Sequence, residues 1–189
     1  MENISLELAR IHAHLCGDGY TCIWKTKQKG RKFIAVTGYC NNNHRLLDKF
    51  QRDFSKTFGV KMKMRRKKGE VSISSIRIHK EIRNKFGDFG SKKWRIPPSI
   101  KNSSKEIKLE WLKSFFEDEA YCEEKYNRLK TKSVNLEGLK EIKELLNSLN
   151  IFSTLTGPNC DKSYYLTIPK FNEVKGFSNF VKEPIRKVL

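Results

Sequence analysis

The fold is decided by Leu8-Ala9-Arg10-Ile11-His12-Ala13-His14-Leu15-Cys16-Gly17-Asp18-Gly19-Tyr20. This stretch is predicted to form a helix of about three turns that ends on an acid, followed by a small residue and an aromatic. Ala13 and Gly17 are four positions apart, so they share one helix face and allow another backbone to approach closely. Gly19 suits the left-handed conformation that often closes a helix. The first helix is therefore expected to pack tightly against a partner.

A second stretch in the other half of the chain matches the first, and it reads Glu110-Trp111-Leu112-Lys113-Ser114-Phe115-Phe116-Glu117-Asp118-Glu119-Ala120-Tyr121. It has the same predicted length and the same ending of acid, small residue and aromatic. We expect the two helices to pack side by side, with Ala13 and Gly17 facing Ser114 and Asp118.

This packing would bring two acids, Asp18 and Glu119, together at an electrostatically unfavourable position. Carboxylates favour the N-terminal end of a helix, whereas both acids lie at the negative C-terminal end. Two like charges in one site also raise the pKa of at least one of them. A bound divalent cation reverses this penalty, and carboxylates are ligands that Mg²⁺ prefers. The two acids therefore indicate a metal site.

The segments Gly17-Asp18-Gly19-Tyr20 and Asp118-Glu119-Ala120-Tyr121 resemble the paired motifs of the LAGLIDADG homing endonucleases. The acids are 101 residues apart, a separation that fits the single-chain, two-motif type. The resemblance implies an α+β fold with two pseudo-symmetric αββαββα halves and saddle-shaped antiparallel sheets. It also implies that Asp18 and Glu119 bind catalytic Mg²⁺ or Mn²⁺. The backbone carbonyls of Gly17 and Asp118, which precede the acids, are implied to face the metal as well.

Periodicity alone predicts the same element order in the first half. Polar and turn residues separate strands at 20–26 and 31–38, a helix that follows Asn41-Asn42-Asn43 and closes at Gly59, strands at 60–65 and 71–78, and a helix at 80–86. The alternation is clearest at 60–65, where apolar side chains face one way and cations the other.

The second half repeats this order after a proline-containing linker. Pro97 and Pro98 are expected to prevent a helix there, and Ser103 with Glu106 is expected to form a capping box before the second motif helix. A short hairpin at 121–124 and 128–133, a helix from Asn135, strands at 151–156 and 164–168 and a helix at 171–180 complete the prediction. The domains are accordingly placed at 1–95 and 105–189, joined by a linker at 96–104.

The charge of the chain indicates a polyanionic partner. The formal net charge is +18, and residues 1–100 carry 23 Lys and Arg against 8 Asp and Glu. Cations on strands neutralise phosphates, and a two-stranded ribbon fits the major groove of DNA. The residues predicted to contact double-stranded DNA are Lys25, Lys27, Lys29, Arg31, Lys32, Lys61, Lys63, Arg65, Lys125, Arg128, Lys132 and Lys162.

Fewer residues are predicted for the chemistry around the metal. The resemblance makes Asn41, and Ser133 in the matching place before Asn135, candidates for ordering water around the metals, as polar residues do in the family, although a capping role of the asparagines is at least as consistent with the sequence. Lys130 is the first candidate for stabilising charge on the leaving phosphate. His12 and His14 lie two apart and point to different helix faces, so they cannot share a metal; each is expected to be a surface or interface residue.

The composition limits the cellular setting. No apolar run approaches the roughly 20 residues of a membrane helix, and five cysteines form an odd set without a paired spacing. We therefore expect a cytoplasmic monomer without membrane contact. Two functions remain open at this point. One is a site-specific endonuclease that breaks both strands of a long asymmetric DNA site. The other is a catalytically degenerate binder of the same fold, such as a maturase on intron RNA or a transcriptional regulator.

Overall fold

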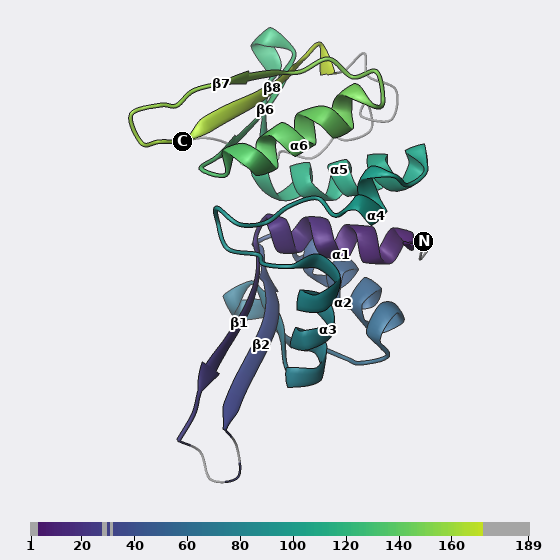
Figure 1. Ribbon diagram of the computed structural model, residues 1–189, viewed down its shortest axis with the longest axis vertical. Coiled ribbons are helices and arrows are strands. Elements are labelled where there is room, and N and C mark those ends of the chain that lie inside the picture. Colours follow the sequence, from purple (N-terminus) through teal and green to yellow (C-terminus); the bar gives the residue numbers. More distant parts are fainter. Residues whose placement is uncertain (1–3, 28–29, 31, 172–189) are drawn as a thin grey trace.

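The computed structural model describes residues 4–27, 30 and 32–171. Two long helices, α1 (Leu6–Cys16) and α5 (Lys105–Glu119), lie side by side at the centre of the molecule, and one half of the chain extends on each side of them (Figure 1). Each half contains a four-stranded antiparallel sheet. The predicted α+β fold with two similar halves is confirmed.

The same element order occurs twice. The first half continues from α1 through β1 (Gly19–Lys25), β2 (Phe33–Cys40), α2 (His44–Phe58), β3 (Lys63–Arg65), the short 3₁₀ helix η1 (Arg66–Lys68), β4 (Glu70–Ser74) and α3 (Ile76–Phe86). After α4 (Pro98–Lys101), the second half runs through α5, β5 (Ala120–Glu123), the 3₁₀ helix η2 (Glu124–Tyr126), β6 (Arg128–Ser133), α6 (Leu136–Asn147), β7 (Thr154–Thr156) and β8 (Tyr164–Pro169). Residues 172–180 of the expected final helix lie outside the described residues.

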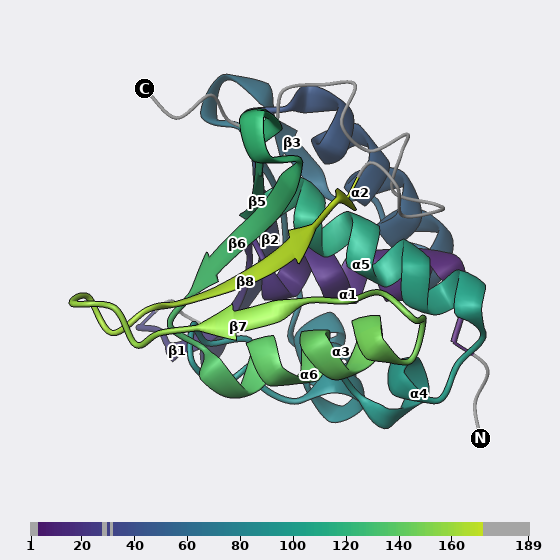
Figure 2. The same ribbon diagram turned by 90° about the horizontal axis from the view of Figure 1, so that it is seen from above.

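The two sheets also share their strand order and register. The orders are β1-β2-β4-β3 and β5-β6-β8-β7, and Figure 2 shows β6, β8 and β7 side by side with α6 along them. Gly19 pairs with Tyr39 in the first sheet, and Ala120 pairs with Thr131 in the second. Each motif therefore enters its sheet in the same way, and positions of the two halves can be matched one to one.

Among the described residues, helices cover only one face of the first sheet. Tyr39 and Val71 point toward α1 and α2 and are fully buried, and Thr21 contacts His79 of α3 through a 2.8 Å hydrogen bond. Because side chains alternate along a strand, Tyr20 and Trp24 lie on the opposite face. We call this second face, which the helices leave uncovered, the open face of the sheet.

The predicted helix ends of α2 are confirmed. Asn43 is its N-cap, with a side chain that accepts a hydrogen bond from the backbone N–H of Arg45 at 3.0 Å. Gly59 closes the helix with a φ of 66°, a left-handed conformation that glycine adopts without strain. Leu47, Phe50 and Phe54 form the buried face between these ends.

Several predictions of local structure were wrong, including the starts of the helix predicted at 80–86 and of the strand predicted at 151–156, which begin at Ile76 and Thr154. The strand predicted at 71–78 ends at Ser74, because Ser75 caps α3 by accepting a hydrogen bond from the N–H of Ile78. Ser104, not Ser103, caps α5 through the N–H of Ile107, and this shift by one residue removes the expected capping box. Pro98 does not prevent a helix either. It occupies the first position of α4, where a missing N–H has no consequence.

The linker is held firmly against the second half. Trp94 is almost completely buried, and its backbone oxygen accepts a hydrogen bond from Asn135 Nδ2 at 2.9 Å. A Cβ atom on Gly138 would lie 2.4 Å from the Trp94 ring, so α6 can pack here only with a glycine. Glu141 of α6 accepts the backbone N–H of Ile96 at 2.7 Å. These contacts fix the path between the two halves.

Charged residues join the helices of the two halves near the middle of α1. Arg10 makes a bidentate pair with Asp53 of α2, with distances of 2.6 and 2.8 Å, and also contacts Glu110 of α5 at 3.4 Å. Asp53 is buried, so its carboxylate has lost most of its hydration, and the bidentate ion pair with Arg10 compensates for that loss.

His12 belongs to the interface between α1 and α5 and is fully buried. Its Nδ1 accepts a hydrogen bond from Trp111 Nε1 at 2.8 Å, and its ring packs against Phe86 and Phe89. Burial lowers the pKa of His12 from 6.5 to about 3. The imidazole is therefore neutral in the folded protein at ordinary pH.

We expect His12 to make the protein sensitive to acid. In the unfolded chain it binds a proton below about pH 6.5, whereas in the folded protein it does so only near pH 3. The buried neutral imidazole therefore contributes to the free energy of unfolding in full above the pKa of the unfolded chain. This contribution is lost as the pH falls toward 3, at about 1.4 kcal/mol per pH unit. Urea unfolding between pH 7 and 4 should show a smaller loss for His12→Gln than for the wild type. Equal losses would contradict the buried neutral imidazole.

The described residues include no helix that is long and apolar enough to cross a membrane. All five cysteines lie in the described part of the chain, and none of them forms a disulfide there.

Candidate active site and nucleic-acid interface

The two motif helices meet at Gly17 and Asp118. A Cβ atom added to Gly17 would lie 2.8 Å from the Cβ of Asp118, so only glycine permits this approach. The predicted facing of these two residues is confirmed, and Ala13 and Ser114 are both fully buried. Asp18 and Glu119 directly follow this contact in the chain, and both are half-buried. The paired acids thus flank the point where the two halves touch.

The carboxylate of Asp118 is the centre of a buried hydrogen-bond network. Tyr39 donates its hydroxyl to Oδ1 at 2.5 Å, and His14 Nδ1 lies 2.9 Å from Oδ2. Because an ionised carboxylate can only accept, His14 carries its proton on Nδ1. Asn41 Nδ2 also reaches Oδ1, at 3.4 Å. Asp118 is only 3% exposed, and these donors compensate for the burial of its charge.

This network includes residues whose roles the sequence did not indicate. His14 lies in the interface between the halves, as one of the two options for it predicted, and it is fully buried. Tyr39 was not a candidate. Burial and the neighbouring Asp118 raise the pKa of Tyr39, so its hydroxyl keeps the proton that it donates. The sequence offered no signal for Tyr39, because the predicted strand ended at residue 38 and its position opposite Gly19 follows only from the strand pairing.

Asn41 connects the buried network to the first motif acid. Its Nδ2 donates to Asp18 Oδ2 at 3.0 Å, while its Oδ1 accepts the backbone N–H of Asn43 at 2.8 Å. Ser133 occupies the matching place in the second half, where its Oγ accepts the backbone N–H of Asn135 at 3.1 Å. Both residues therefore shape the turn before a helix. The Asn41 amide can donate two protons, whereas a serine hydroxyl can donate one.

The acids fit a hard divalent cation. Asp18 and Glu119 offer carboxylate oxygens that are partly accessible, at the negative ends of two helices. Among the described residues no cluster of three or more His, Cys, Asp or Glu could hold a metal by itself. Mg²⁺ commonly uses one or two carboxylates and takes its other ligands from water and substrate phosphates.

Lys130 lies on β6, opposite Tyr121 of β5. Its Nζ forms an ion pair with Glu123 at 3.0 Å and lies 5.6 Å from the centre of the Tyr165 ring. The three side chains lie on the face of the second sheet that matches the open face of the first, and we call it the open face of the second sheet. The role of Lys130 toward a leaving phosphate stays a prediction.

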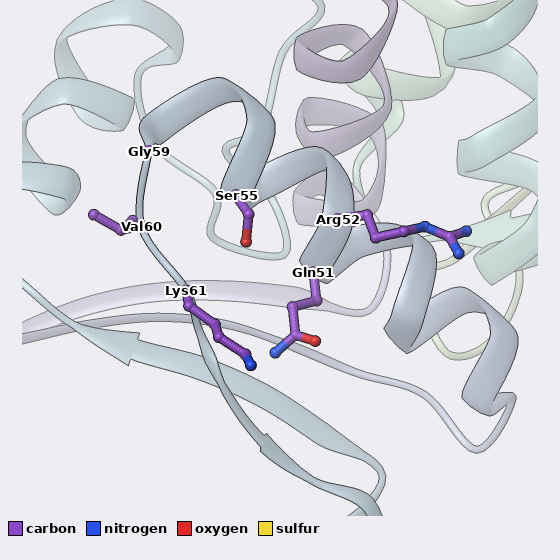
Figure 3. A pocket seen from close by; sticks show the side chains of 6 residues that line it. All are labelled: Gln51, Arg52, Ser55, Gly59, Val60 and Lys61. Carbon is purple, nitrogen blue, oxygen red and sulfur yellow. The ribbon is translucent and has the colours of Figure 1, made fainter.

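Three of the predicted cations of the first sheet, Lys61, Lys63 and Arg65, lie at its β3 edge or just before it. Lys63 and Arg65 are exposed on the open face, and Arg65 pairs with Glu70 at 2.8 Å. Lys61 precedes β3, so the predicted strand at 60–65 is shorter than expected, although the alternation of exposed and buried side chains is confirmed. Figure 3 shows Lys61 and Gln51 pointing toward one another in a surface hollow of about 550 Å³ beside α2.

The cations of the β1–β2 hairpin are arranged less uniformly than a basic ribbon would require. Lys25, Lys27 and Lys32 are exposed, but Lys25 pairs with Phe33 on the face that is opposite to Trp24. Lys29 and Arg31 lie outside the described residues. Lys25 therefore does not lie on the open face of the sheet.

The second sheet places its cations on a central strand. Arg128, Lys130 and Lys132 alternate with the buried residues Leu129 and Thr131 of β6. Lys132 forms an ion pair with Asp161 at 2.6 Å. The predicted short hairpin is confirmed, and at its end the cations of Lys125 and Arg128 lie over the Tyr126 ring. Lys162 is exposed in the turn before β8.

A basic turn beside the candidate active site was missed at the sequence level. Arg66, Lys67 and Lys68 form η1 and are exposed. The turn ends at Gly69, whose backbone oxygen accepts the N–H of Asn41 at 2.8 Å. The charge run is visible in the sequence, but its position at the inner end of the sheet follows only from the strand pairing.

Comparison with known proteins shows that the chain is similar to solved structures. No family model and no curated protein sequence matches the chain. A structure from work on mesophilic variants of the homing endonuclease I-DmoI is similar, with a TM-score of 0.69 and 18% identity, covering 98% of this chain and 100% of that one. I-DmoI in complex with DNA and Mn has a TM-score of 0.68 and 16% identity, with 94% and 97% coverage.

A more distant structure agrees with these two. The LAGLIDADG homing endonuclease I-GzeII in complex with its DNA target has a TM-score of 0.55 and 12% identity, with 96% and 86% coverage. All three similarities extend over both halves and the linker. The chain therefore has the fold of the single-chain LAGLIDADG homing endonucleases.

Proposed function

We propose that the protein is a site-specific DNA endonuclease that makes metal-dependent double-strand breaks in a long asymmetric duplex. One observation carries the proposal: the two motif acids, Asp18 and Glu119, flank the close contact between Gly17 and Asp118 that joins two sheet-bearing halves. Such an arrangement can present one acid to each strand of a duplex. The DNA in the complexes of I-DmoI and I-GzeII supports the same reading by analogy of fold.

Asp18 and Glu119 would hold Mg²⁺ or Mn²⁺, and the backbone carbonyls of Gly17 and Asp118 would be further candidate ligands. A bound ion would polarise the scissile phosphate and increase the acidity of water. The residues of the chain orient this site: Asn41 holds the Asp18 carboxylate at 3.0 Å and also contacts Asp118 at 3.4 Å. The Asn41 side chain thereby links the interface between the halves to the candidate metal ligand through two hydrogen bonds.

The duplex would lie across the open faces of the two sheets. The cations of β3 and β6 lie on these faces, and the net charge of +18 favours a polyanion. The chain supplies both halves itself, so a monomer suffices for an asymmetric site. Proposed phosphate contacts include the three cations of η1, which lie beside Asn41 and thus close to the acids.

The proposal is tested by cleavage of a randomised duplex library in Mg²⁺, with sequencing of the cut ends. We expect paired cuts within one recurring sequence and no cuts in the presence of EDTA. Binding of duplexes without metal-dependent cleavage, in a library shown to contain bound sites, would overturn the endonuclease.

A non-enzymatic binder of the same fold is the second candidate, and Asp118 is the observation that favours it. Its carboxylate takes up part of the Asn41 amide, which would otherwise be available to order water near the acids. A maturase or a regulator would need the open faces but not the acids. Preference for structured RNA over the duplex library would identify a maturase.

Duplex affinity is expected to fall steeply as the salt concentration rises, because the cations at the β3 edge would contact phosphates. Each phosphate contact contributes about 0.9 to the slope of log affinity against log salt. The triple variant Lys61→Ala, Lys63→Ala, Arg65→Ala should therefore flatten this slope by about 2–3 units. Fluorescence anisotropy at several salt concentrations measures it.

The matched control removes three exposed cations from α3, which lies on the covered side of the first sheet: Arg77, Lys80 and Lys85. This variant has the same net charge as the test variant, so a difference between them reports location rather than total charge. The triple variant Lys125→Ala, Arg128→Ala, Lys130→Ala should have a smaller effect than the β3 variant. An equal slope for the β3 and α3 variants would place the interface elsewhere.

A further inference from the structure

The outer part of the β1–β2 hairpin has an apolar surface on the open face of the first sheet. Register places Cys22 opposite Val36 and Trp24 opposite Ile34, and all four side chains point to the same side. Trp24 is 45% exposed, and Cys22 is exposed as well. We call these four residues the hairpin patch.

Within the described part of the chain, the packing of the fold leaves Cys22 and Trp24 exposed and Ile34 and Val36 half-exposed. The hairpin extends beyond the helices in Figure 1, and α3 contacts its other face, where Ala35 is buried. Exposed aromatic and aliphatic side chains that adjoin each other commonly mark a contact surface. The cations Lys63 and Arg65 lie on the same open face, at the β3 edge of the sheet. The patch therefore shares one face of the sheet with the proposed DNA interface.

The matching surface of the second half has the opposite character. The register pairs described above equate Cys22 with Glu123 and Val36 with Arg128. An apolar pair in the first half thus corresponds to a charged pair in the second. The two halves would read different chemical groups, although they share strand order and register.

We propose that the hairpin patch reads the C5-methyl groups of thymines in the major groove, in the half-site bound by the first sheet. The inference rests on the proposed DNA-binding function. The major groove is where base pairs differ in their groups, and the thymine methyl is the apolar one among them. Of the patch side chains, Trp24 has a strong donor in its Nε1–H, and the others offer mainly apolar surface. Methyl contacts are consequently what this surface can recognise.

The experiment starts from the duplexes that the full-length protein selects from a randomised library. Each thymine of a selected duplex is replaced in turn by deoxyuridine, which lacks only the C5-methyl group. Burial of one such group contributes about 0.8 kcal/mol, so we expect about fourfold weaker binding for each methyl contacted. The sensitive thymines should fall in one half-site, and deoxyuridine in the other half-site should change binding little.

Two variants assign the effect to the patch. In Trp24→Ala, the ratio of the affinities for the thymine and deoxyuridine duplexes should fall to about one at the affected positions. Ile23→Ala is the matched control, because Ile23 is also 45% exposed but lies on the opposite face of the same strand. It should retain the fourfold difference. Both residues lie outside the core, and circular dichroism checks that both variants fold.

The outcomes separate this inference from the proposed function. Specific binding with equal affinity for thymine and deoxyuridine throughout would overturn the inference alone. Failure to enrich any duplex would overturn the DNA-binding function together with it. A dimer in sedimentation that Trp24→Ala dissociates would assign the patch to self-association and overturn the inference as well.

Discussion

Replacing Asp18 by asparagine is expected to reduce DNA cleavage by at least about 100-fold while leaving duplex binding in Ca²⁺ nearly unchanged. The substitution keeps the size of the side chain and removes the negative charge that a divalent cation requires. A metal ion stabilises a phosphoryl transition state by several kcal/mol, which corresponds to this loss of rate. The side-chain oxygen at position 18 can still accept from Asn41, so the local structure should persist. Single-turnover cleavage and anisotropy measure the two effects.

Glu119→Gln should behave in the same way, because Glu119 ends the second motif helix as Asp18 follows the first. The matched control is Glu117→Gln. Glu117 is also a half-buried acid on α5, but its partner is Lys49 at 3.3 Å. This variant should cleave at nearly the wild-type rate. Wild-type cleavage by both motif variants would show that these carboxylates do not hold the catalytic metal.

The sequence predicted the fold because its local and global signals agree. Asn43 and Gly59 bound α2 with side-chain and backbone preferences that act within a few residues, and the apolar spacing between them needs no knowledge of the partner. The errors occurred where two local signals compete. Ile76 and Ile78 have β-branched side chains that favour a strand, yet the cap at Ser75 begins a helix there.

Those residues of the candidate site that belong to the two motifs were predictable from the sequence. Asp18 and Glu119 follow from the motif endings alone. The network around Asp118 does not, because Tyr39 and His14 reach it from β2 and α1, and such long-range contacts depend on register and helix packing. The ion pairs of the cations were not predictable for the same reason. The number of cations was evident from the sequence, whereas the acids paired with them, such as Glu70 and Glu123, become visible only through strand pairing.

The contact between Gly17 and Asp118 should be the most sensitive point of the fold. Gly17→Ala places a Cβ atom at 2.8 Å from both the Cβ and the Oδ2 of Asp118. We expect a loss of about 1–3 kcal/mol in the free energy of unfolding, as for other overpacked sites. Asp118→Gly should lose about 3 kcal/mol or more, because Tyr39 and His14 remain buried without their acceptor.

The double variant decides whether these two losses share a cause. Without the side chain at 118, the added methyl at 17 has room, so the double variant should be less destabilised than the sum of the single variants by about 1–3 kcal/mol. Gly17→Ala combined with Phe152→Ala, a substitution at a residue 68% exposed, should instead be additive within about 0.5 kcal/mol. Additivity of the first pair in urea unfolding would mean that α1 and α5 do not touch at these residues. Coupling would mean that a buried acid and a glycine together set the separation of the motif helices, and with it the placement of Asp18 and Glu119.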